Sequence, residues 1–581
     1  MQSKNIYMIG VLAILISPLF YMGHAHASID SIPASAVCIP PTEGSAQPWK
    51  VPPGWKVALV AEEDPEGLYF EDLPDMNVQN PVEIEMPHVL RARGVVDEVA
   101  ERGRLFYQAH EIWEGGSSVS VIDLKTGLIA KMVEADHLEA VDPVIWTPWN
   151  TIIFAEEMIA QNIRDPTLPD VVGGLAYEMN PVTGEYWPLP QLGAKAHEGF
   201  VIDEEMNIYG VDENRRGGIY KFVPEVDPRT VGRVPDGKLY ALKVVDDDAA
   251  PGPRTGRAVW VELDQTQARI DANVALLAAG ATVYNRPEDM EMIGGKIYVA
   301  LTDVRAPGPV DNRVIAIDIS QDDPFVTEFV VPGVNVPVEV DNVGDKTDEV
   351  TGFKNPDNLA SRGEELWIVE DNGPSDIWVA LPDEDGDGYS DHVYLFASME
   401  DCEAEGTGIR WGIEGFSNML FVTQMHAGPT IDGREVGPDR VFVIFRAGLA
   451  AMDEDDGDDV INIGESIGIR FDSDALTSIT ALTVTTPDGD TCYYTDTLPA
   501  RVPEGGFTAT YPDEFAYGDG TTCDTSRAGT YMVMLTTEVG DPVITTFETS
   551  WSVVPEAVIG VIGTIGAAVG TLLAYRRAAY R

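Results

Sequence analysis

The stretch ELWIVEDN at residues 365–372 shows most clearly the pattern that decides the fold, a short β-rich strand that ends in acidic and polar residues. Its Leu, Trp, Ile and Val are residue types that pack well on a pleated sheet. Similar stretches start about 45 to 90 residues apart, the range expected for β-propeller blades with insertions. The other five are RLFYQAHE (104–111), TIIFAEE (151–157), NIYGVDEN (207–214), KIYVALTD (296–303) and MLFVTQMH (419–426).

Each stretch is followed by a loop and then by a second strand, and long helical periodicity is absent from about residue 50 to 450. Strand-turn-strand units with Asp at the turn also occur in β-sandwiches, because Asp stabilises turns. A propeller is favoured because its inner blade strands converge, so that the polar ends of the repeated strands would meet. We therefore expect an all-β fold with a propeller as its main unit.

The charge of the chain limits its partners. Lys+Arg is 38 and Asp+Glu is 96, which gives a net charge of −58. Nucleic acid is excluded as a partner, because its phosphates would be repelled. Most of this charge is typical of a solvated acidic surface, as in salt-adapted secreted proteins, whereas particular acidic clusters suggest bound calcium.

The N-terminus has the features of a signal peptide. Lys4 precedes a mostly apolar run at 6–20, and Ala25-His26-Ala27 resembles a cleavage site. An uncleaved membrane anchor is the alternative. We expect export, with residues 1–27 removed.

A second apolar segment, residues 557–575, is long enough to cross a bilayer as a helix of about 28 Å. Arg576 and Arg577 follow it and predict that this end stays cytoplasmic, with the rest of the chain outside. The segment also resembles sorting tails that are clipped by a membrane transpeptidase. We expect a surface protein anchored through this C-terminal transmembrane helix.

Between these parts, short alternating strands after about residue 452 predict an Ig-like β-sandwich that serves as a stalk. The expected organisation is a signal peptide (1–27), a propeller (28–452), a sandwich (453–553) and an anchor or sorting tail (554–581).

Four cysteines in an exported chain predict disulfides. Cys492 and Cys523 lie in the same late domain and are the expected pair, which leaves Cys38 to pair with Cys402. No CxxC spacing occurs, so a thiolate metal site is not indicated.

Carboxylates gather at the ends of the repeated strands, and their mutual repulsion is tolerable if a multivalent cation lies among them. Oxygen-only clusters suit Ca²⁺, Mg²⁺ or Mn²⁺, while added imidazole or thiolate suits iron. A single such residue is more often a turn or salt-bridge residue, so the hypothesis depends on the set. The set includes His110-Glu111, Glu156-Glu157, His197-Glu198, Asp212-Glu213, Glu288, Asp357, Asp371 and Glu405.

From about residue 110 to 428 the sequence resembles the PhoX-type alkaline phosphatases. One of these short motifs alone would be weak, but eight in order are highly specific. They are TPWNTIIFAEE (147–157), AHEGFVID (196–203), IYGVDEN with GGIYKFVP (208–224), RPEDMEMIGGKIYVALTD (286–303), NPDNLA (355–360), LWIVEDNG (366–373), AEGTG (404–408) and QMHAG (424–428).

The resemblance implies a six-bladed propeller with iron and calcium ions on its axis that hydrolyses phosphate monoesters. Arg286 would bind the phosphate, since a guanidinium fork suits phosphate oxygens. With Arg286, the expected catalytic residues are Glu111 and Glu198. The expected metal ligands are Glu111, Glu156, Glu157, Glu198, Asp212, Glu288, Asp357, Asp371 and Glu405.

The chain departs from the family at two positions. Ala155 stands where the family usually has a cysteine whose thiolate bridges the irons, and Ala109 stands where an Asn usually precedes the His-Glu motif. Loss of a soft ligand should weaken iron binding. We expect Ca²⁺ as the cofactor and leave Fe³⁺ open.

The loop DEDGDGYSD at 383–391 resembles a calcium-binding loop. Its acidic residues occupy positions 1, 3, 5 and 9, with Gly388 at position 6, but Tyr394 stands at position 12 where a full EF-hand has Glu. An acidic surface turn is the alternative. The expected ligands are Asp383, Asp385, Asp387 and Asp391.

Together these features predict an exported, surface-anchored, metal-dependent phosphatase-like protein that acts on a small phosphorylated substrate as a monomer. Two alternatives share the architecture: a non-catalytic calcium-binding cell-envelope propeller, and a calcium-dependent lactonase-like hydrolase. The second fits the quoted motifs less well.

Overall fold

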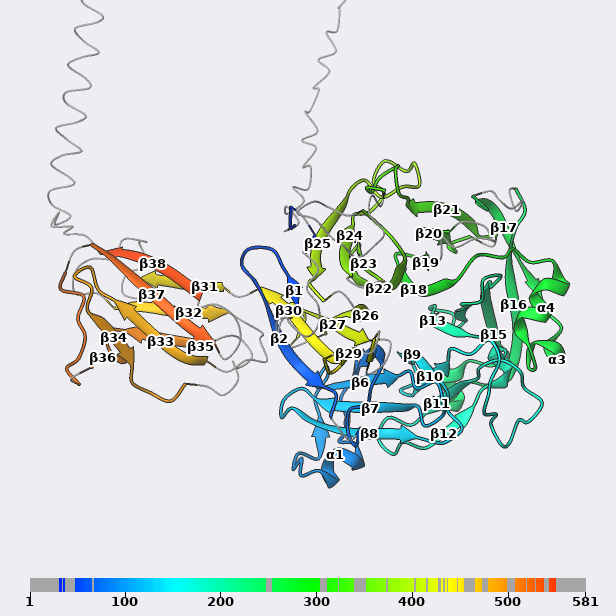
Figure 1. The fold of residues 1–581 in the computed structure, drawn as a ribbon, viewed down its shortest axis with the longest axis horizontal. Coiled ribbons are helices and arrows are strands. Elements are labelled where there is room, and N and C mark those ends of the chain that lie inside the picture. Colours follow the sequence, from blue (N-terminus) through cyan, green and yellow to red (C-terminus); the bar gives the residue numbers. More distant parts are fainter. Residues whose placement is uncertain are drawn as a thin grey trace, which may run out of the picture.

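The computed structural model has an all-β fold, as predicted, in which sheets are arranged around a common centre (Figure 1). The structure describes residues 31–33, 35–36, 48–64, 67–246, 253–302, 311–321, 323–338, 352–371, 375–401, 404–413, 416–426, 430–431, 434–435, 437–446, 448–453, 466–472, 479–498, 507–518, 520–527, 529–537 and 543–549.

The first two sheets of the ring are antiparallel, and their strands follow one another in sequence order from the centre outward. Most residues of their inner strands are buried, because both faces of each sheet pack against a neighbour. The first sheet contains β3 (Pro74–Gln79), β6 (Leu105–His110), β7 (Ser118–Asp123) and β8 (Leu128–Glu134), and the second contains β9 (Val141–Trp146), β10 (Ile152–Glu156), β11 (Ala176–Met179) and β12 (Tyr186–Pro188).

The next two groups of strands are joined into one nine-stranded sheet. The first group is β13 (His197–Ile202), β14 (Ile208–Asp212), β15 (Ile219–Pro224) and β16 (Gly237–Val244), and the second is β18 (Pro287–Ile293), β19 (Lys296–Leu301), β20 (Arg313–Asp318) and β21 (Phe325–Val330). The link is β17 (Gly256–Glu262), which pairs with β16 on one side and with the start of β21 on the other.

The last two sheets each include a strand from the N-terminal region. Because β2 pairs with β30 along its length, it ties the two ends of the ring together. One sheet contains β22 (Pro356–Arg362), β23 (Glu365–Glu370), β24 (Asp376–Ala380), β25 (Val393–Met399) and β1 (Trp49–Lys50), and the other contains β26 (Ala404–Trp411), β27 (Met419–His426), β30 (Arg440–Arg446) and β2 (Trp55–Glu62).

The ring closes through its innermost strands, since β3, β9, β13, β18, β22 and β26 each contact the next and β26 contacts β3. Buried apolar clusters fill the spaces between neighbouring sheets. At the junction of the first and last sheets, the rings of Phe106 and Phe421 lie 4.9 Å apart. Short elements lie outside these sheets: β4 (Ile84–Glu85), β5 (Val99–Ala100), α1 (His88–Ala92), η1 (Pro190–Leu192), α2 (Pro228–Val231), α3 (Gln265–Ala268), α4 (Ala272–Ala279), β28 (Thr430–Ile431) and β29 (Arg434–Glu435).

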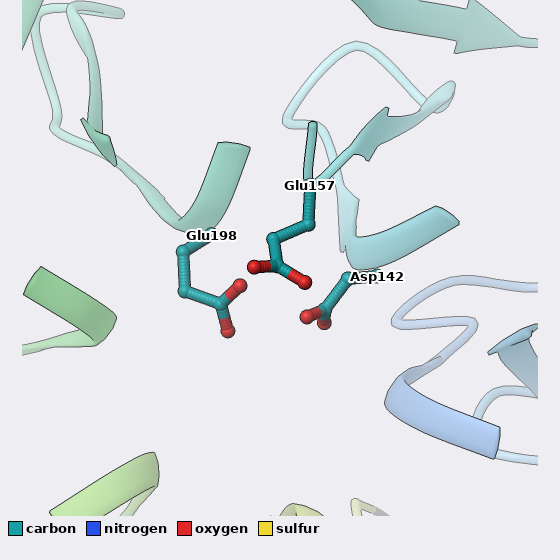
Figure 2. Close-up of side chains that lie close together, drawn as sticks. All are labelled: Asp142, Glu157 and Glu198. Carbon is teal, nitrogen blue, oxygen red and sulfur yellow. The ribbon is translucent and has the colours of Figure 1, made fainter. Parts of the chain in front are cut away.

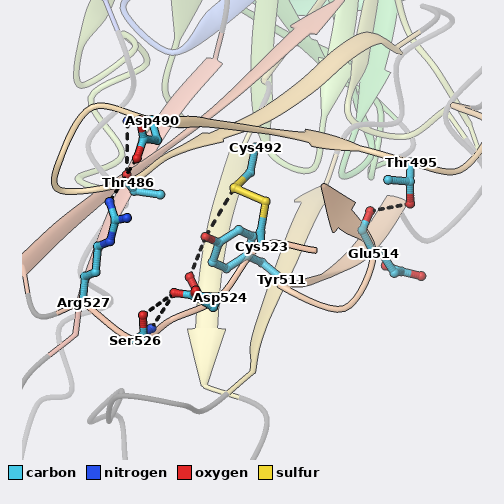
Figure 3. The surroundings of a disulfide bond; sticks show 10 residues. All are labelled: Thr486, Asp490, Cys492, Thr495, Tyr511, Glu514, Cys523, Asp524, Ser526 and Arg527. Carbon is cyan, nitrogen blue, oxygen red and sulfur yellow. Dashed lines mark hydrogen bonds and ion pairs between the residues drawn. A yellow bond between two sulfur atoms is a disulfide. The ribbon is translucent and has the colours of Figure 1, made fainter. Parts of the chain in front are cut away.

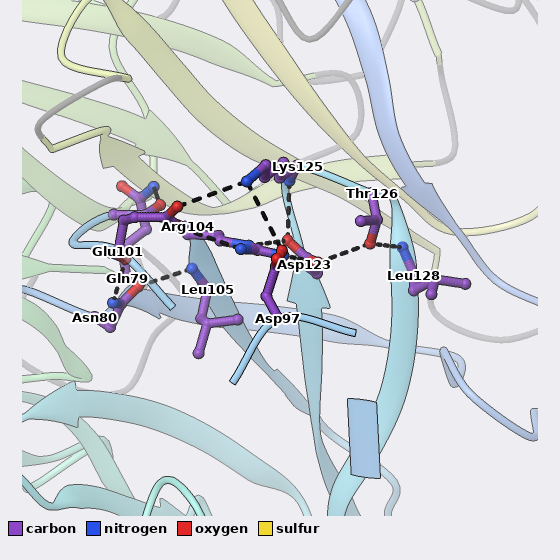
Figure 4. Close-up of polar contacts among 11 residues, drawn as sticks. Gln79, Asn80, Asp97, Glu101, Arg104, Leu105, Asp123, Lys125, Thr126 and Leu128 are labelled. Carbon is purple, nitrogen blue, oxygen red and sulfur yellow. Dashed lines mark hydrogen bonds and ion pairs between the residues drawn. The ribbon is translucent and has the colours of Figure 1, made fainter. Parts of the chain in front are cut away.

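A buried ion pair in the first sheet joins the start of β6 to the end of β7. The Arg104 guanidinium donates to both carboxylate oxygens of Asp123 at 2.8 Å, and it also bonds Asp97 and Glu101 (Figure 4). Asp123 in turn accepts from the hydroxyl of Thr126 in the turn that follows β7. The hairpin geometry is thereby held by charge-assisted bonds on well-buried groups.

A second β unit follows the ring. One sheet contains β31 (Gly448–Asp453), β32 (Ile467–Asp472) and β35 (Phe507–Tyr511), and the other contains β36 (Phe515–Tyr517), β34 (Thr491–Tyr494), β33 (Ile479–Thr485), β37 (Gly529–Thr537) and β38 (Val543–Thr549). They share one buried apolar cluster. Since β31 pairs with β32, the strand at the expected boundary of residue 452 belongs with this second unit.

The predicted disulfide between Cys492 and Cys523 is present, with Cα atoms 6.3 Å apart (Figure 3). The Tyr511 hydroxyl lies 3.6 Å from the Cys492 sulfur and donates to the carbonyl of Asp524. The bond therefore lies in the buried centre of the second unit.

Several expectations fall outside the described residues: the signal peptide (1–27), the tail (554–581) and the Cys38–Cys402 pair. Within the part of the chain that is described, no helix combines the length and apolar character that a membrane crossing requires.

Candidate metal and phosphate site

A cavity of about 860 Å³ opens among the inner strands, and acidic residues dominate its wall. Ten carboxylate side chains line it, against three cationic ones. The carboxylates are Asp75, Glu111, Asp142, Glu157, Glu198, Glu213, Glu288, Asp357, Asp371 and Glu405.

Six of these carboxylates occupy the same position, the second residue of an innermost strand. Each inner strand thus brings one acidic side chain to the same end of the ring, which is why the cavity wall is built of acids. They are Asp75 in β3, Asp142 in β9, Glu198 in β13, Glu288 in β18, Asp357 in β22 and Glu405 in β26.

The other four carboxylates follow the strands next to the inner ones. Glu111 comes directly after β6, Glu157 after β10, Glu213 after β14 and Asp371 after β23. Antiparallel pairing places these strand ends beside the starts of the inner strands, so the two sets meet in one cavity.

Two predicted ligands, Glu156 and Asp212, do not line the cavity. Each is the last residue of its strand and lies one position before a cavity carboxylate, and a shift of one residue turns a side chain to the opposite face. Glu156 accepts from Gln161 Nε2 and from the backbone N–H groups of Glu139 and Leu175.

Asp212 accepts from Asn273 Nδ2 at 2.8 Å, and burial raises its pKa to about 6. The neighbouring Lys195 is also buried, and it donates to Leu192 O and to Nδ1 of His197. Asp212 is thus part of a structural network behind the cavity wall.

The backbone directly before four inner strands is strained. Leu73, Ala140, Arg286 and Asn355 have φ values of 51°, 44°, 42° and 45°, a region that non-glycine residues rarely adopt. Three of them precede a proline, which normally favours extended backbone with negative φ. Strain of this kind persists where the surrounding structure enforces it, and it concentrates at functional sites.

Two overlapping groups of cavity carboxylates have the spacing of a cation site. Oxygens of Asp142, Glu157 and Glu198 lie within 4.8 Å of one another, and so do oxygens of Glu198, Glu288 and Asp357. Figure 2 shows the first three carboxyl groups directed toward one another. Glu198 belongs to both groups, which makes it the central member of the set.

The carboxyl groups of the cavity are electrostatically unfavourable by themselves. Burial raises the pKa of Glu198 well above its usual range, and the charges of Asp142 and Asp357 raise it further. Burial, and after it the charge of Asp142, also raises the pKa of Glu111 and the pKa of Asp75. A bound cation would reverse this penalty by neutralising the charges.

Several carboxylate oxygens in the cavity also have no hydrogen-bond partner among the described residues. They are Asp75 Oδ1, Glu111 Oε1, Asp142 Oδ1 and Glu198 Oε2. A buried acceptor left unpaired costs about 1–3 kcal/mol. Such oxygens have the chemistry of ligands for a hard cation such as Ca²⁺.

Arg286 lies among the acids, with its side chain 22% exposed. It forms a close ion pair with Glu213, its Nε is 3.3 Å from Glu288 Oε1, and its Nη1 is 3.7 Å from Asp371 Oδ2. Lys354 and Arg215 line the same cavity. The wall therefore offers cationic groups to an anion as well as carboxylates to a cation.

Neither histidine of the two His-Glu pairs lines the cavity. His110 bonds the Ser120 hydroxyl and the Asp72 carbonyl, while His197 bonds the Gly193 carbonyl and Lys195. Ala155, at the family's cysteine position, is fully buried in an apolar cluster. Among the described residues, the acidic part of the wall is an oxygen-only donor set.

The loop at 383–391 forms a separate acidic group, in which Asp383, Asp385 and Asp391 have oxygens within 4.8 Å of one another. Asp387 instead accepts from the backbone N–H of Tyr389. Asp383 accepts from the N–H groups of Gly386, Asp387 and Gly388.

Two acids of the cavity, Asp75 and Asp142, were not among the residues expected from the sequence. Asp75 follows Pro74 and Asp142 precedes Pro143, so each stands beside a proline at the start of an inner strand, as Glu288 and Asp357 do. This proline-acid pairing is the signal that would have found them. Glu213 belongs to the expected set of strand-end carboxylates, in which Asp212 and not Glu213 was expected as a ligand, and it is Glu213 that lines the cavity.

Comparison with known proteins gives one family match. The family described as alkaline phosphatase PhoX matches residues 146–391. No curated protein matches this chain. The PhoX-type resemblance predicted from the ordered motifs is thus confirmed, over a segment that carries Glu157, Glu198, Arg286, Glu288 and Asp357.

Among solved structures, PhoX of Pseudomonas fluorescens in complex with vanadate, a transition-state analogue, matches with a TM-score of 0.49 and 18% identity, covering 72% of this chain and 97% of that one. A catalytically inactive virginiamycin B lyase from Staphylococcus aureus matches with a TM-score of 0.32 and 11% identity, covering 67% and 99% of the two chains.

Proposed function

We propose that this PhoX-type chain hydrolyses phosphate monoesters in the central cavity, with divalent cations held by its carboxylates. The observation that carries the proposal is the coexistence in one cavity of a guanidinium, Arg286, with clustered carboxylates, of which Asp142 and Glu198 each keep one oxygen without a hydrogen-bond partner among the described residues. The family match supports a phosphatase. The choice of cation follows from the donor set.

Calcium fits the residues present. Asp142, Glu157 and Glu198 supply one group of oxygens, and Glu288 and Asp357 supply a second group around the shared Glu198. Hard oxygen donors suit Ca²⁺, Mg²⁺ or Mn²⁺. A thiolate-bridged iron pair does not fit, because Ala155 is enclosed by apolar side chains. A divalent cation in this site would supply Lewis acidity and charge neutralisation.

Arg286 would bind two oxygens of the phosphoryl group through its guanidinium fork. Glu213 and Glu288 fix the direction of this fork from two sides. Stabilisation of the developing charge by such a preplaced cation is usually a large part of catalysis of phosphoryl transfer. Lys354 and Arg215 add positive charge to the same wall.

Glu198 and Glu111 have distinct roles in this proposal. Glu198 belongs to both carboxylate groups, so it would couple the two cation positions. Glu111 is buried and keeps one oxygen unpaired, which suits a ligand or an acceptor for the hydroxyl of an incoming water. Both residues line the cavity, where they would contact the cations and the substrate.

The wider organisation is part of the same proposal. We interpret the described sheets as six blades of a propeller and the second unit as an Ig-like sandwich. The signal-like segment at 1–27 and the apolar segment at 557–575 support export and anchoring at the cell surface, with the propeller outside. A monomer is expected.

The test is hydrolysis of an aryl phosphate by the purified chain supplied with Ca²⁺, Mn²⁺ or iron. The proposal expects turnover with a hard divalent cation and a loss of about 100-fold in kcat/KM for Arg286→Ala. Absence of turnover with every metal, while Ca²⁺ still binds, would favour the non-catalytic binding propeller instead. Equal activity of wild type and Arg286→Ala would refute the assigned phosphate site.

A further inference from the structure

The mouth of the cavity has an apolar side that the proposed chemistry does not use. Trp113 and Ile159 line the cavity, yet they are 47% and 58% exposed. Among the tryptophans that the structure describes, Trp113 alone is more than a third exposed. Together with Ile159 it places exposed apolar surface at the mouth of the cavity, where such surface can contact a ligand.

The position of Trp113 is fixed by its backbone surroundings. The Ser117 hydroxyl accepts from Ile112 N at 3.0 Å and donates to Ile112 O at 2.8 Å, and Ala140 N donates to the same carbonyl. Gly115 has a φ of 85°, and a Cβ there would lie 2.5 Å from the Asp136 carbonyl oxygen. The ring is therefore presented by a tightly packed turn, which lowers the entropic cost of binding a ligand on it.

The wall is divided by charge. Trp113 and Ile159 follow β6 and β10, whereas the cationic residues Arg215, Arg286 and Lys354 follow β14 or precede β18 and β22. The two exposed apolar residues thus belong to the first two sheets, and the cationic residues belong to the nine-stranded sheet and to the sheet that contains β22. A ligand that bridges them carries an anionic group at one end and an apolar group at the other.

The size of the cavity agrees with such a ligand. At about 860 Å³ it lies in the upper part of the range of roughly 300–1,000 Å³ typical of pockets for drug-sized ligands, much more than one phosphate needs. Aromatic groups stack on an exposed tryptophan face with a specific gain beyond the area that they bury. An aliphatic polyol would gain little there.

We infer that Trp113 and Ile159 form a subsite for an aromatic group attached to the phosphate, so that the preferred substrates are aromatic phosphate monoesters. This inference rests on the proposed function and names its substrate class. The phosphate would lie on the Arg286 side and the ring on Trp113.

Turnover of phenyl phosphate and of glycerol 2-phosphate would be compared for the wild type, Trp113→Ala and Trp113→Phe, with Ca²⁺ supplied. The inference predicts that Trp113→Ala lowers kcat/KM about tenfold for phenyl phosphate, mainly through KM, and less than twofold for glycerol 2-phosphate. Trp113→Phe should retain most of the preference. Phe325→Ala, at an aromatic residue that is 46% exposed outside the cavity, serves as the matched control.

A binding measurement separates this inference from the proposed function. Calorimetry with phenylphosphonate and methylphosphonate needs no turnover, and the inference predicts tighter binding of phenylphosphonate that Trp113→Ala abolishes. Loss of turnover with this preference intact would overturn the phosphatase and leave the aromatic subsite standing. Equal affinity for the two phosphonates, or equal losses on both esters in Trp113→Ala, would overturn the subsite.

Discussion

The central cavity and the loop at 383–391 are both acidic, and each contains carboxylates with oxygens within 4.8 Å of one another. They differ in burial and in hydrogen bonding. In the cavity, Asp142 and Glu198 are buried, and each keeps one oxygen without a hydrogen-bond partner in the part of the chain that is described. In the loop, Asp385 and Asp391 are exposed, and Asp383 accepts three backbone N–H groups of its own turn.

This difference distinguishes a carboxylate cluster that requires a bound cation from an acidic surface turn that does not. An exposed carboxylate is solvated, so it imposes no strong need for a cation. A buried carboxylate without a partner is costly, and several together are costlier still, because each raises the pKa of the next. Dependence on a cation should therefore be large for the cavity and small for the loop.

The largest effect is expected from Glu198→Gln, because this residue belongs to both cavity groups. The substitution removes one negative charge and one ligand oxygen from each group, and kcat/KM for an aryl phosphate should fall at least about 100-fold.

Glu178→Gln is the matched control. Glu178 is equally buried, but it accepts from Trp149, Thr151, Trp187 and Val234 and does not line the cavity. Its loss should lower stability and leave kcat/KM of the folded protein unchanged. Similar kcat/KM losses in both variants would contradict the claim that cavity carboxylates, unlike buried carboxylates elsewhere in the fold, act in catalysis.

The next effect concerns stability and pH in the absence of cations. Burial raises the pKa of the cavity carboxyls above their unfolded values of about 4. Folding then favours their neutral forms, so their contribution is complete below about pH 4 and is lost as pH rises through the raised values.

Chelated protein should consequently lose free energy of unfolding as the pH rises above about 4. Saturating Ca²⁺ should remove most of this dependence. Urea unfolding at several pH values, with EGTA and with Ca²⁺, measures both. Identical pH profiles in the two conditions would contradict a cation site in the cavity.

A smaller effect separates two adjacent residues. Glu157→Gln should weaken Ca²⁺ binding about tenfold, since it alters the cavity group. Glu156→Gln should leave Ca²⁺ affinity unchanged and lower stability by about 1–3 kcal/mol, because its oxygens accept three buried hydrogen bonds. Calorimetric titration decides, and a reversed order would show that the strand register is wrong.

The smallest effect is expected in the loop. If the loop binds calcium, EGTA should lower the thermal midpoint of Asp383→Asn by less than it lowers that of the wild type. The substitution should cost less than about 1 kcal/mol in the free energy of unfolding and leave turnover unchanged. Heat melting of the wild type and Asp383→Asn with and without EGTA measures this. A large activity loss in Asp383→Asn would break the proposed contrast between the two acidic groups.

Much of the site followed from the sequence because the strands repeat. Glu198, Glu288, Asp357 and Glu405 were predicted from motifs at strand ends, and all line the cavity. Glu156 and Asp212 were predicted with them but lie behind the wall. Periodicity of two makes the last strand residue and the next one face opposite ways, and the sequence alone does not say where the strand stops.

Other features needed the three-dimensional arrangement. Asp75 carries the proline-acid signal, but it precedes the first copy of the repeat by about thirty residues, so its position beside the other carboxylates becomes clear only when β3 pairs with β6 as an innermost strand. The apolar pair Trp113 and Ile159 is likewise formed by loops of two different sheets. Contacts that span sheets leave no local pattern in the chain.

The central claim is that buried carboxylates of the cavity hold hard divalent cations. Elemental analysis of the purified chain after dialysis tests it most directly, with wild type, Glu198→Gln and Asp383→Asn compared side by side. We expect bound Ca²⁺ in the wild type, a marked loss in Glu198→Gln, and at most a minor change in Asp383→Asn. A metal-free wild type, or full metal content in Glu198→Gln, would contradict it.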